Sequence, residues 1–313
     1  MKKLLWIVNP HAGRGAMSGK VIGCVTAFQQ AGYDVTLYVT QGAQDATRVA
    51  RERAGEFDRI ICAGGDGTLN EVVTGLMEAP VRPSLGYIPA GTTNDFAQSL
   101  DIPKVPAEAA VIAAGDRLQA LDIGRFNDRY FNYIAAFGVF TEVSYATPQQ
   151  SKNIFGRAAY IFEGVKALTN IKAYHIRVES EEVTIEDDFI YGMVTNSRSV
   201  GGFKGIIGPD VVFDDGEFEV TLIKTPRNPI ELNDLLGAIM LRQINPERMY
   251  SFKSGCVRFE SMEAIPWTLD GEYGGSHEEV TVRNSRQALR IMVRQETVAG
   301  LSAEKAEKEL VKK

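Results

Sequence analysis

The chain has 313 residues, of which 44% are hydrophobic and 24% are charged. This is the composition of an ordinary globular protein, and it excludes a disordered, collagen-like or disulfide-stapled chain. Its 34 basic and 40 acidic side chains give a net charge of -6, which argues against a general nucleic-acid binder, because such proteins are usually basic.

The start of the chain predicts a buried strand rather than a targeting segment. Residues 4–8 form an apolar run that ends at Asn9-Pro10, shorter than the roughly 7–15 residues of a signal-peptide core. No apolar stretch approaches the roughly 18 residues of a membrane span. We therefore expect a cytoplasmic protein, and at roughly 150 residues per domain the length predicts two domains.

The first 125 residues alternate between strand-like and helix-like segments. Apolar runs predict strands at residues 4–8, 35–39, 59–63 and 85–88. Between and after these strands, apolar side chains at helical spacing predict four helices, of which the first is ended by Gly32 and the third is capped by Thr68. The fourth helix is expected at residues 107–114. The buried faces of the first three are, in order, Val21, Cys24, Val25 and Phe28; Val49, Ala50 and Ala54; and Leu69, Val72, Val73, Leu76 and Met77. This alternation predicts a mostly parallel sheet with helices on both faces.

From Ala120 onward the pattern is that of a mainly antiparallel β domain. Asp215-Gly216 and Asp270-Gly271 are turn signals between β-branched and aromatic runs. We expect strands at residues 130–137, 175–179, 189–195, 218–223, 257–260, 280–282 and 289–293, helices near 155–170 and 229–242, and a short charged helix from Ser302. The fold class is therefore α/β followed by β.

The segment Gly64-Gly65-Asp66-Gly67-Thr68 lies between a predicted strand and a predicted helix. Glycines let the backbone approach a ligand closely, and the start of the helix offers unpaired N–H groups to an anion such as phosphate. Asp66 would repel phosphate unless a divalent cation lay between them. A tight turn with a capping aspartate is the alternative.

Two further loops are expected at the same edge of the sheet. Residues 9–15 follow the first strand and residues 89–95 follow the fourth. Ligands of open α/β sheets bind beyond the carboxyl ends of the strands, so the three loops should meet at one crevice. Neither loop has the spacing of a dinucleotide fingerprint or a P-loop.

These segments, GGDGT at 64–68, PAGTTNDFA at 89–97 and Asn9-Pro10, together resemble the diacylglycerol kinase catalytic-domain family, most closely its soluble bacterial lipid kinases. The resemblance continues at residues 121–124, 213–216 and 269–272, and so runs to about residue 295. It implies a nucleotide-binding domain at 1–124, a β-sandwich-like lipid domain at 125–295, and a C-terminal helix at about 296–313 that returns to the first domain.

The resemblance also implies roles for individual residues. Asp66, Asp95 and Asp122 would form a carboxylate and water network around magnesium. Glu272 is the favoured general base, with Asp270 in the same network as the alternative base. The residues expected to hold ATP are Asn9, Pro10, His11, Ala12, Gly13, Thr40, Gly64, Gly65, Asp66, Gly67, Thr68, Leu69, Asn70 and Thr92.

A second, structural magnesium ion would use the side chain of Asp215 and the carbonyls of Val212 and Glu217, again by resemblance. One departure from the family is His11-Ala12, where many members carry serine or threonine. The general chemistry agrees with these roles, because phosphoryl transfer needs mainly positioning and neutralisation of charge by magnesium.

The expected function is an ATP- and magnesium-dependent lipid kinase that converts diacylglycerol to phosphatidic acid. Basic and aromatic residues mixed along 151–166 would contact an anionic membrane surface transiently, and strand edges of the β domain permit a homodimer. The alternatives are an NAD kinase-like phosphotransferase, since GGDGT is shared with that family, and a non-catalytic lipid- or nucleotide-binding regulator. Neither the acceptor lipid nor the nucleotide donor is fixed by a motif.

Overall fold

The computed structural model of the chain describes residues 1–14, 17, 19–139, 172–197, 199–200, 203–204, 211–228, 231, 235, 245 and 247–294. Four expectations lie wholly or mostly outside these residues: the helices near 155–170 and 229–242, the C-terminal helix, and the membrane-contacting segment 151–166. In the parts described, no helix is both long enough and apolar enough to cross a membrane.

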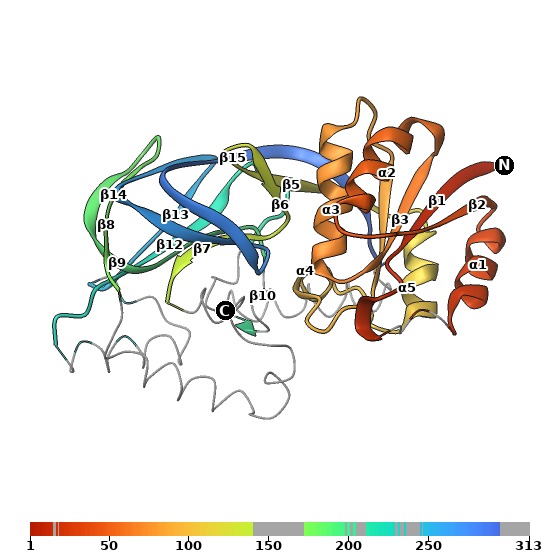
Figure 1. Cartoon of the computed structure of the whole chain (residues 1–313), viewed down its shortest axis with the longest axis horizontal. Helices are drawn as coiled ribbons and strands as arrows, with labels where there is room; N and C mark the ends of the chain where they lie inside the picture. The colour runs from red at the N-terminus through yellow and green to blue at the C-terminus, as the bar shows by residue number, and fades with distance from the viewer. Residues whose placement is uncertain are drawn as a thin grey trace, which may run out of the picture.

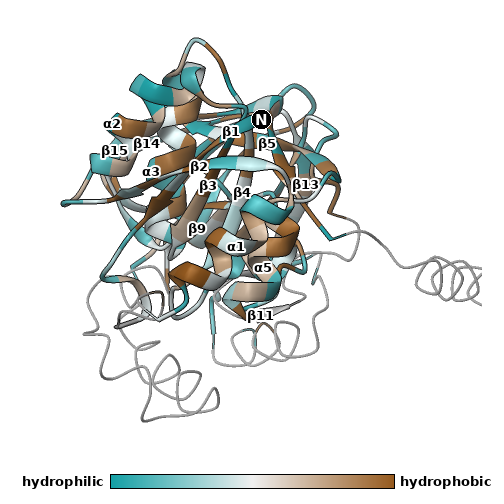
Figure 2. Ribbon diagram, turned by 90° about the vertical axis from the view of Figure 1, so that its right-hand side faces the viewer, coloured by the Kyte–Doolittle hydropathy of each residue, from teal (hydrophilic) through white to brown (hydrophobic). Residues whose placement is uncertain are grey.

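The N-terminal half is a parallel sheet with helices on both faces, as predicted. Its strands lie in the order β2-β1-β3-β4. Figure 2 shows α1 and α5 on one face of this sheet and α2 and α3 on the other. The elements are β1 (Lys2–Val8), η1 (Ala12–Arg14), α1 (Val21–Gln30), β2 (Tyr33–Val39), α2 (Asp45–Arg53), η2 (Ala54–Glu56), β3 (Arg59–Gly64), α3 (Asp66–Glu78), β4 (Ser84–Pro89), α4 (Asp95–Ser99) and α5 (Pro106–Ala113).

The start of α3 differs from the sequence-based expectation. The helix begins at Asp66 with Gly65 in the N-cap position, so Thr68 lies inside the first turn and does not cap it. Thr68 instead accepts a hydrogen bond from the side chain of Asn9 at 2.9 Å. The local sequence could not show this, because the hydroxyl group of Thr68 is hydrogen-bonded to Asn9, 59 residues earlier in the chain.

The C-terminal half is built from antiparallel strands, which confirms the predicted fold class. Strands β7 and β8 each pair with both β9 and β14, and β12 joins β9 to β13. The elements are β5 (Leu118–Phe126), β6 (Arg129–Phe131), β7 (Ile134–Gly138), β8 (Tyr174–Glu179), β9 (Thr184–Thr195), β10 (Ser199–Val200), β11 (Phe203–Lys204), β12 (Phe218–Lys224), β13 (Met249–Ser254), β14 (Cys256–Leu269) and β15 (Glu272–Met292).

The described residues form two large apolar cores, and the first, built mainly from the N-terminal half, also includes side chains of the C-terminal half such as Leu289 and Ile291. The second core is centred on Trp267, whose ring centroid lies 4.9 Å from that of Phe137 and 5.1 Å from those of Phe126 and Phe259. The first core contains the buried faces of the helices and of β1, β3 and β4. Burying these side chains supplies the main driving force for each half.

A ribbon of two strands, β5 and β15, runs through both halves (Figure 1). At one end, residues 123–126 pair with residues 282–285, and at the other, residues 118–121 pair with residues 289–292. A bulge separates these stretches, and Ile291 lies beside Leu85 of β4 in the parallel sheet. The ribbon therefore makes the two halves parts of one continuous sheet.

Candidate active site

Three loops meet at the carboxyl ends of β1, β3 and β4, as the sequence predicts. Because these strands are parallel neighbours, their following loops leave the sheet side by side. Backbone hydrogen bonds join them: Asn9 N–H donates to the Ala63 carbonyl at 2.9 Å, and Ala90 N–H donates to the Gly64 carbonyl at 2.8 Å. Thr40, at the end of β2, is buried and donates its N–H to the Val8 carbonyl at 2.9 Å.

The side chain of Asn9 fixes the first loop to the start of α3. Its Nδ2 donates to Thr68 Oγ1 at 2.9 Å, and its Oδ1 accepts from the His11 backbone N–H at 2.9 Å. Gly13 follows with φ of 55°, a backbone conformation that glycine adopts at no steric cost. These contacts fix the Asn-Pro turn even though His11-Ala12 provides no serine or threonine hydroxyl group.

The other two loops are in backbone contact. A Cβ atom placed on Gly91 would lie 2.7 Å from the Cα atom of Gly65, far inside van der Waals contact. Asn94 fixes the third loop, since its Oδ1 accepts from Gly91 N–H at 2.9 Å and its Nδ2 donates to the Gly91 carbonyl at 2.8 Å. Tyr87 adds a hydrogen bond from its hydroxyl to the Gly64 carbonyl at 3.1 Å.

Three carboxylates, those of Asp66, Asp95 and Asp270, lie close enough to interact electrostatically beside these loops. Burial raises the pKa of Asp66 to about 6, the negative charges of Asp95 and Asp270 add to the rise, and the N–H groups of Phe96 and Asn94 oppose it. Oδ1 of Asp66 is buried and has no hydrogen-bond partner among the residues that the structure describes. A buried carboxylate oxygen beside like charges suits a hard divalent cation.

Asp270 is the most constrained of these carboxylates. Its Oδ2 accepts from the backbone N–H of Asn132 at 2.7 Å and from Asn70 Nδ2 at 2.9 Å. Its Oδ1 accepts from the backbone N–H groups of Tyr133 at 3.0 Å and Ile134 at 3.2 Å. Burial raises its pKa to about 6, and these donors lower it. With four donors, Asp270 is placed to hold the two halves together.

Glu272 reaches the same region from the other side of a tight turn. Asp270 and Gly271 both have positive φ, 50° and 86°, between the paired residues Leu269 and Glu272. The Oε1 atom of Glu272 would be 2.6 Å from a Cβ atom on Gly67, so this carboxylate lies against the first turn of α3. Unlike Asp270, Glu272 is exposed, which leaves it accessible to a bound hydroxyl group.

Asp122 has a different environment from the other predicted magnesium residues. Its Oδ1 accepts from Gln287 N–H at 2.6 Å, and its Oδ2 accepts from Gly216 N–H at 2.7 Å and Asn284 Nδ2 at 3.0 Å. Gln287 lies in the bulge between the two stretches of the β5–β15 ribbon and has φ of 50°. Asp122 therefore ties the bulge to the turn that precedes β12.

At the second predicted metal position, Asp215 faces a lysine. Its Oδ1 accepts from Glu217 N–H at 3.0 Å, and its Oδ2 lies 3.1 Å from Lys253 Nζ. Val212 is in the same turn and is exposed. Across the described part of the chain, no group of three or more histidine, cysteine, aspartate or glutamate side chains is arranged to hold a metal ion by itself.

The sequence-based prediction missed two residues near the carboxylates, Asn132 and Tyr133. Tyr133 is buried, and this burial, with the charges of Asp66, Asp270 and Asp95, raises the pKa of its hydroxyl well above its ordinary value. They belong to an apolar strand region with no motif of their own. Only the pairing of β7 with β14 brings them to Asp270.

The chain matches two family models that together span most of its length. Residues 3–126 match the diacylglycerol kinase catalytic domain, and residues 134–293 match the YegS C-terminal NAD kinase beta sandwich-like domain.

Individual relatives agree with these matches. A diacylglycerol kinase of Bacillus subtilis is 36% identical over 277 residues, which are 88% of this chain and 91% of that protein. One of Staphylococcus haemolyticus is 36% identical over 272 residues, 86% of this chain and 82% of that protein. A crystal structure of a putative diacylglycerol kinase from Bacillus anthracis superposes with a TM-score of 0.81 at 26% identity, covering 94% of this chain and 95% of that one.

Proposed function

Because the chain belongs to the diacylglycerol kinase family and is a lipid kinase, we propose that its acceptor is diacylglycerol and its product phosphatidic acid. The observation that supports this proposal is the meeting of the first turns of α3, at the point where the three loops of the first half converge, with Asp270 and Glu272 of the second half. The first half, residues 1–124, would bind the nucleotide, and the second, residues 125–295, would present the lipid.

The nucleotide site is proposed at the start of α3. This helix has 13 residues and begins at Asp66, directly after the loop that follows β3, so its positive end would attract the phosphates of ATP. The family uses ATP, and we infer the binding residues from their loops: Asn9 to Gly13, Thr40, Gly64 to Asn70 and Thr92.

A magnesium ion fits beside Asp66 and Asp95, because Asp66 Oδ1 is buried, has no partner in the described part of the chain, and lies near other carboxylates. When bound, the ion would neutralise charge on the transferring phosphoryl group. A second ion at Asp215, with the carbonyls of Val212 and Glu217, has weaker support, since Lys253 already supplies a positive charge at 3.1 Å.

In the proposed reaction, Glu272 is the general base. Its exposed carboxylate takes the proton of the lipid hydroxyl while the hydroxyl oxygen forms a bond to the γ-phosphorus and the bond to the bridging oxygen of ADP breaks. Asp270 positions this strand end through its bonds to Asn70 of α3 and to residues 132–134. Such proton transfer contributes about 10²–10⁴-fold to a rate.

The test is to incubate the purified chain with γ-labelled ATP, magnesium and mixed micelles that each carry one candidate lipid, then resolve the products. Labelled phosphatidic acid from diacylglycerol, absent with Asp66→Asn, supports the proposal. Label on another lipid would replace the acceptor and keep the chemistry. A parallel reaction with NAD tests the competing activity of an NAD kinase, whose β sandwich the second matched domain resembles by its description; label on NAD alone would overturn the lipid assignment.

We also propose that the kinase meets its lipid at an anionic membrane surface. The basic residues Lys152, Arg157 and Lys166 support this through their sequence alone. Glutamate at these three positions should reduce sedimentation with anionic vesicles, and unchanged sedimentation would exclude the contact. The expected homodimer is tested by measuring the molecular mass of the protein in solution; the mass of a single chain would exclude it.

A further inference from the structure

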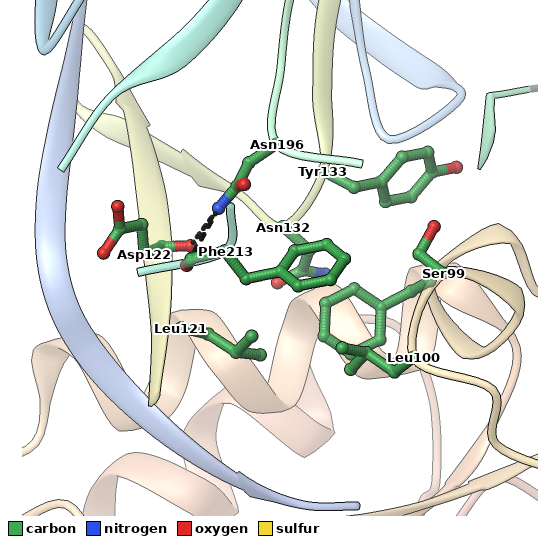
Figure 3. Close-up of a pocket in the computed structure, with 9 residues that line it drawn as sticks. Ser99, Leu100, Leu121, Asp122, Asn132, Tyr133, Asn196 and Phe213 are labelled. Atoms are coloured by element: carbon green, nitrogen blue, oxygen red, sulfur yellow. Dashed lines mark hydrogen bonds between the residues drawn. The ribbon is translucent and has the colours of Figure 1, made fainter. Parts of the chain in front are cut away.

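A small pocket lies behind the carboxylates, where the two halves of the chain meet (Figure 3). It is next to the active site on both sides, since Phe96 follows Asp95 and the N–H of Asn132 donates to Asp270 at 2.7 Å. Its lining residues are Phe96, Ser99, Leu100, Leu121, Asp122, Asn132, Tyr133, Asn196 and Phe213.

The apolar walls of this pocket enclose amide groups that lack partners. Asn132 is 3% exposed, and neither its Nδ2 nor its Oδ1 has a hydrogen-bond partner among the described residues. The Oδ1 of Asn196, which is 5% exposed, also has none. Leaving a buried polar group without a partner is unfavourable, so three such atoms on two residues that line one pocket point to a polar occupant.

The size of the pocket decides between occupants. The space open to the centre of a water molecule is about 10 Å³, and one water needs roughly 10–15 Å³ of such space and two to four polar partners. An acyl chain is far too large. An ester carbonyl would match only the amide N–H group, because it cannot donate to the two Oδ1 atoms. A water donates twice and accepts, which matches all three atoms.

On the other side of the pocket, Asn196 is hydrogen-bonded to the β5 strand of the β5–β15 ribbon. Its Nδ2 donates to the backbone carbonyl of Asp122 at 3.4 Å and to that of Phe213 at 3.3 Å. Figure 3 shows the carboxylate of Asp122 turned away from the pocket. That carboxylate binds the bulge at Gln287. The hydroxyl groups of Ser99 and Ser197 meet across the halves at 2.7 Å.

We propose that Asn132 and Asn196 are positioning residues, which hold one buried water between them and so link the Asp270 turn to the Asp122 clamp on the interdomain ribbon. Through this link the strand end that carries Glu272 is held at a fixed distance from the loops of the first half. The inference rests on the proposed kinase reaction for its kinetic readout, but the water itself does not depend on the identity of the acceptor.

The test compares Asn132→Leu, which keeps the branched shape and the number of heavy atoms of the side chain and removes its polar atoms, with Leu100→Met, a volume-conserving control in the same pocket. Asn132→Leu removes an amide that the protein itself leaves unpaired, so its melting temperature should stay within about 2 °C of the wild type. We expect kcat to fall about tenfold with the KM for ATP unchanged, because a catalytic group is misplaced by a fraction of an ångström. Leu100→Met should retain kcat.

Three results would overturn the proposal. The first is Asn132→Leu with wild-type kcat, and the second is a fall in melting temperature that accounts for the lost activity, which would make Asn132 merely structural. A crystal structure of the wild type should contain a water within hydrogen-bond distance of both amides; a lipid group there instead would also refute it. The melting temperature and the crystal structure need no lipid substrate, so they remain decisive if diacylglycerol is not the acceptor.

Discussion

The contact between Gly65 and Gly91 gives a graded prediction for the loops that we propose bind the nucleotide. In Gly91→Ala the new Cβ atom would be 2.7 Å from the Cα atom of Gly65 and 2.8 Å from Asn94 Oδ1. Carbon atoms in contact are normally about 3.5–4.0 Å apart, so the two loops must separate by about 1 Å. Overpacking of this kind costs about 1–3 kcal/mol of stability.

The same substitution at two other positions provides the comparison. In Gly65→Ala the Cβ atom would be 3.3 Å from Gly91 Cα, which needs a shift of only a few tenths of an ångström. In Gly23→Ala, on α1, the Cβ atom would meet nothing within 4 Å. Alanine is favoured over glycine inside a helix by about 0.5–1 kcal/mol, so this last variant should be slightly more stable than the wild type.

The expected order of activity is therefore wild type and Gly23→Ala together, then Gly65→Ala, then Gly91→Ala. A displacement of about 1 Å near reacting groups can lower a rate about 10²-fold, which sets the scale for Gly91→Ala. The assays are kcat and KM for ATP on micellar lipid, with melting temperatures for all four proteins. Gly91→Ala with normal turnover would refute the argument that the contact between these two loops positions the reacting groups.

Three further results are expected. Glu272→Gln should lower kcat by about 10²–10⁴-fold without changing the melting temperature, because the side chain is exposed; full activity would transfer the role of base to Asp270. The pKa values of Asp66 and Asp270 are raised to about 6, so the folded state binds more protons than the unfolded state between about pH 4 and pH 6, and without metal its stability should fall as pH rises through that window. Magnesium competes with those protons, and its stabilising effect should grow over the same rise; melting temperatures in magnesium and in EDTA that run parallel from pH 4.5 to pH 8 would contradict the site. In Asp122→Asn one carboxylate oxygen is replaced by an amide NH2, so either Gln287 N–H or the pair Gly216 N–H and Asn284 Nδ2 loses its acceptor. The free energy of unfolding in denaturant should fall by about 1.5–3 kcal/mol. Magnesium affinity, measured by calorimetry, should stay unchanged if Asp122 acts only as a clamp.

Local patterns in the sequence were sufficient for the α/β half. Apolar periodicity located its four strands and most of its helices, because each element there buries a face that repeats with its own period. The cap of α3 could not be predicted, since Thr68 is engaged by Asn9. The lengths of β14 and β15 were also underestimated, because both strands continue through polar, partly exposed stretches.

The candidate site divides in the same way. Its three loops could be placed together because they follow parallel strands, and Asp270-Gly271 was recognised as a turn. The donors to Asp270 could not be predicted, because residues 132–134 come close to it only through strand pairing between segments more than 130 residues apart. For the same reason, the clamp made by Asp122 left no local signal. The assignment of ATP, magnesium and general-base residues stays a prediction.

The β5–β15 ribbon also sets an order of events during translation. Leu289 and Ile291 belong to the same core as Leu85 of β4, so the parallel sheet is completed by residues that leave the ribosome last among those described. Until then, β4 has an uncovered edge and an exposed apolar flank, the condition under which nascent chains aggregate. The match to the catalytic-domain family ends at residue 126, and a fragment cut there would keep all three loops proposed to bind the nucleotide yet lack the strand that pairs with β4.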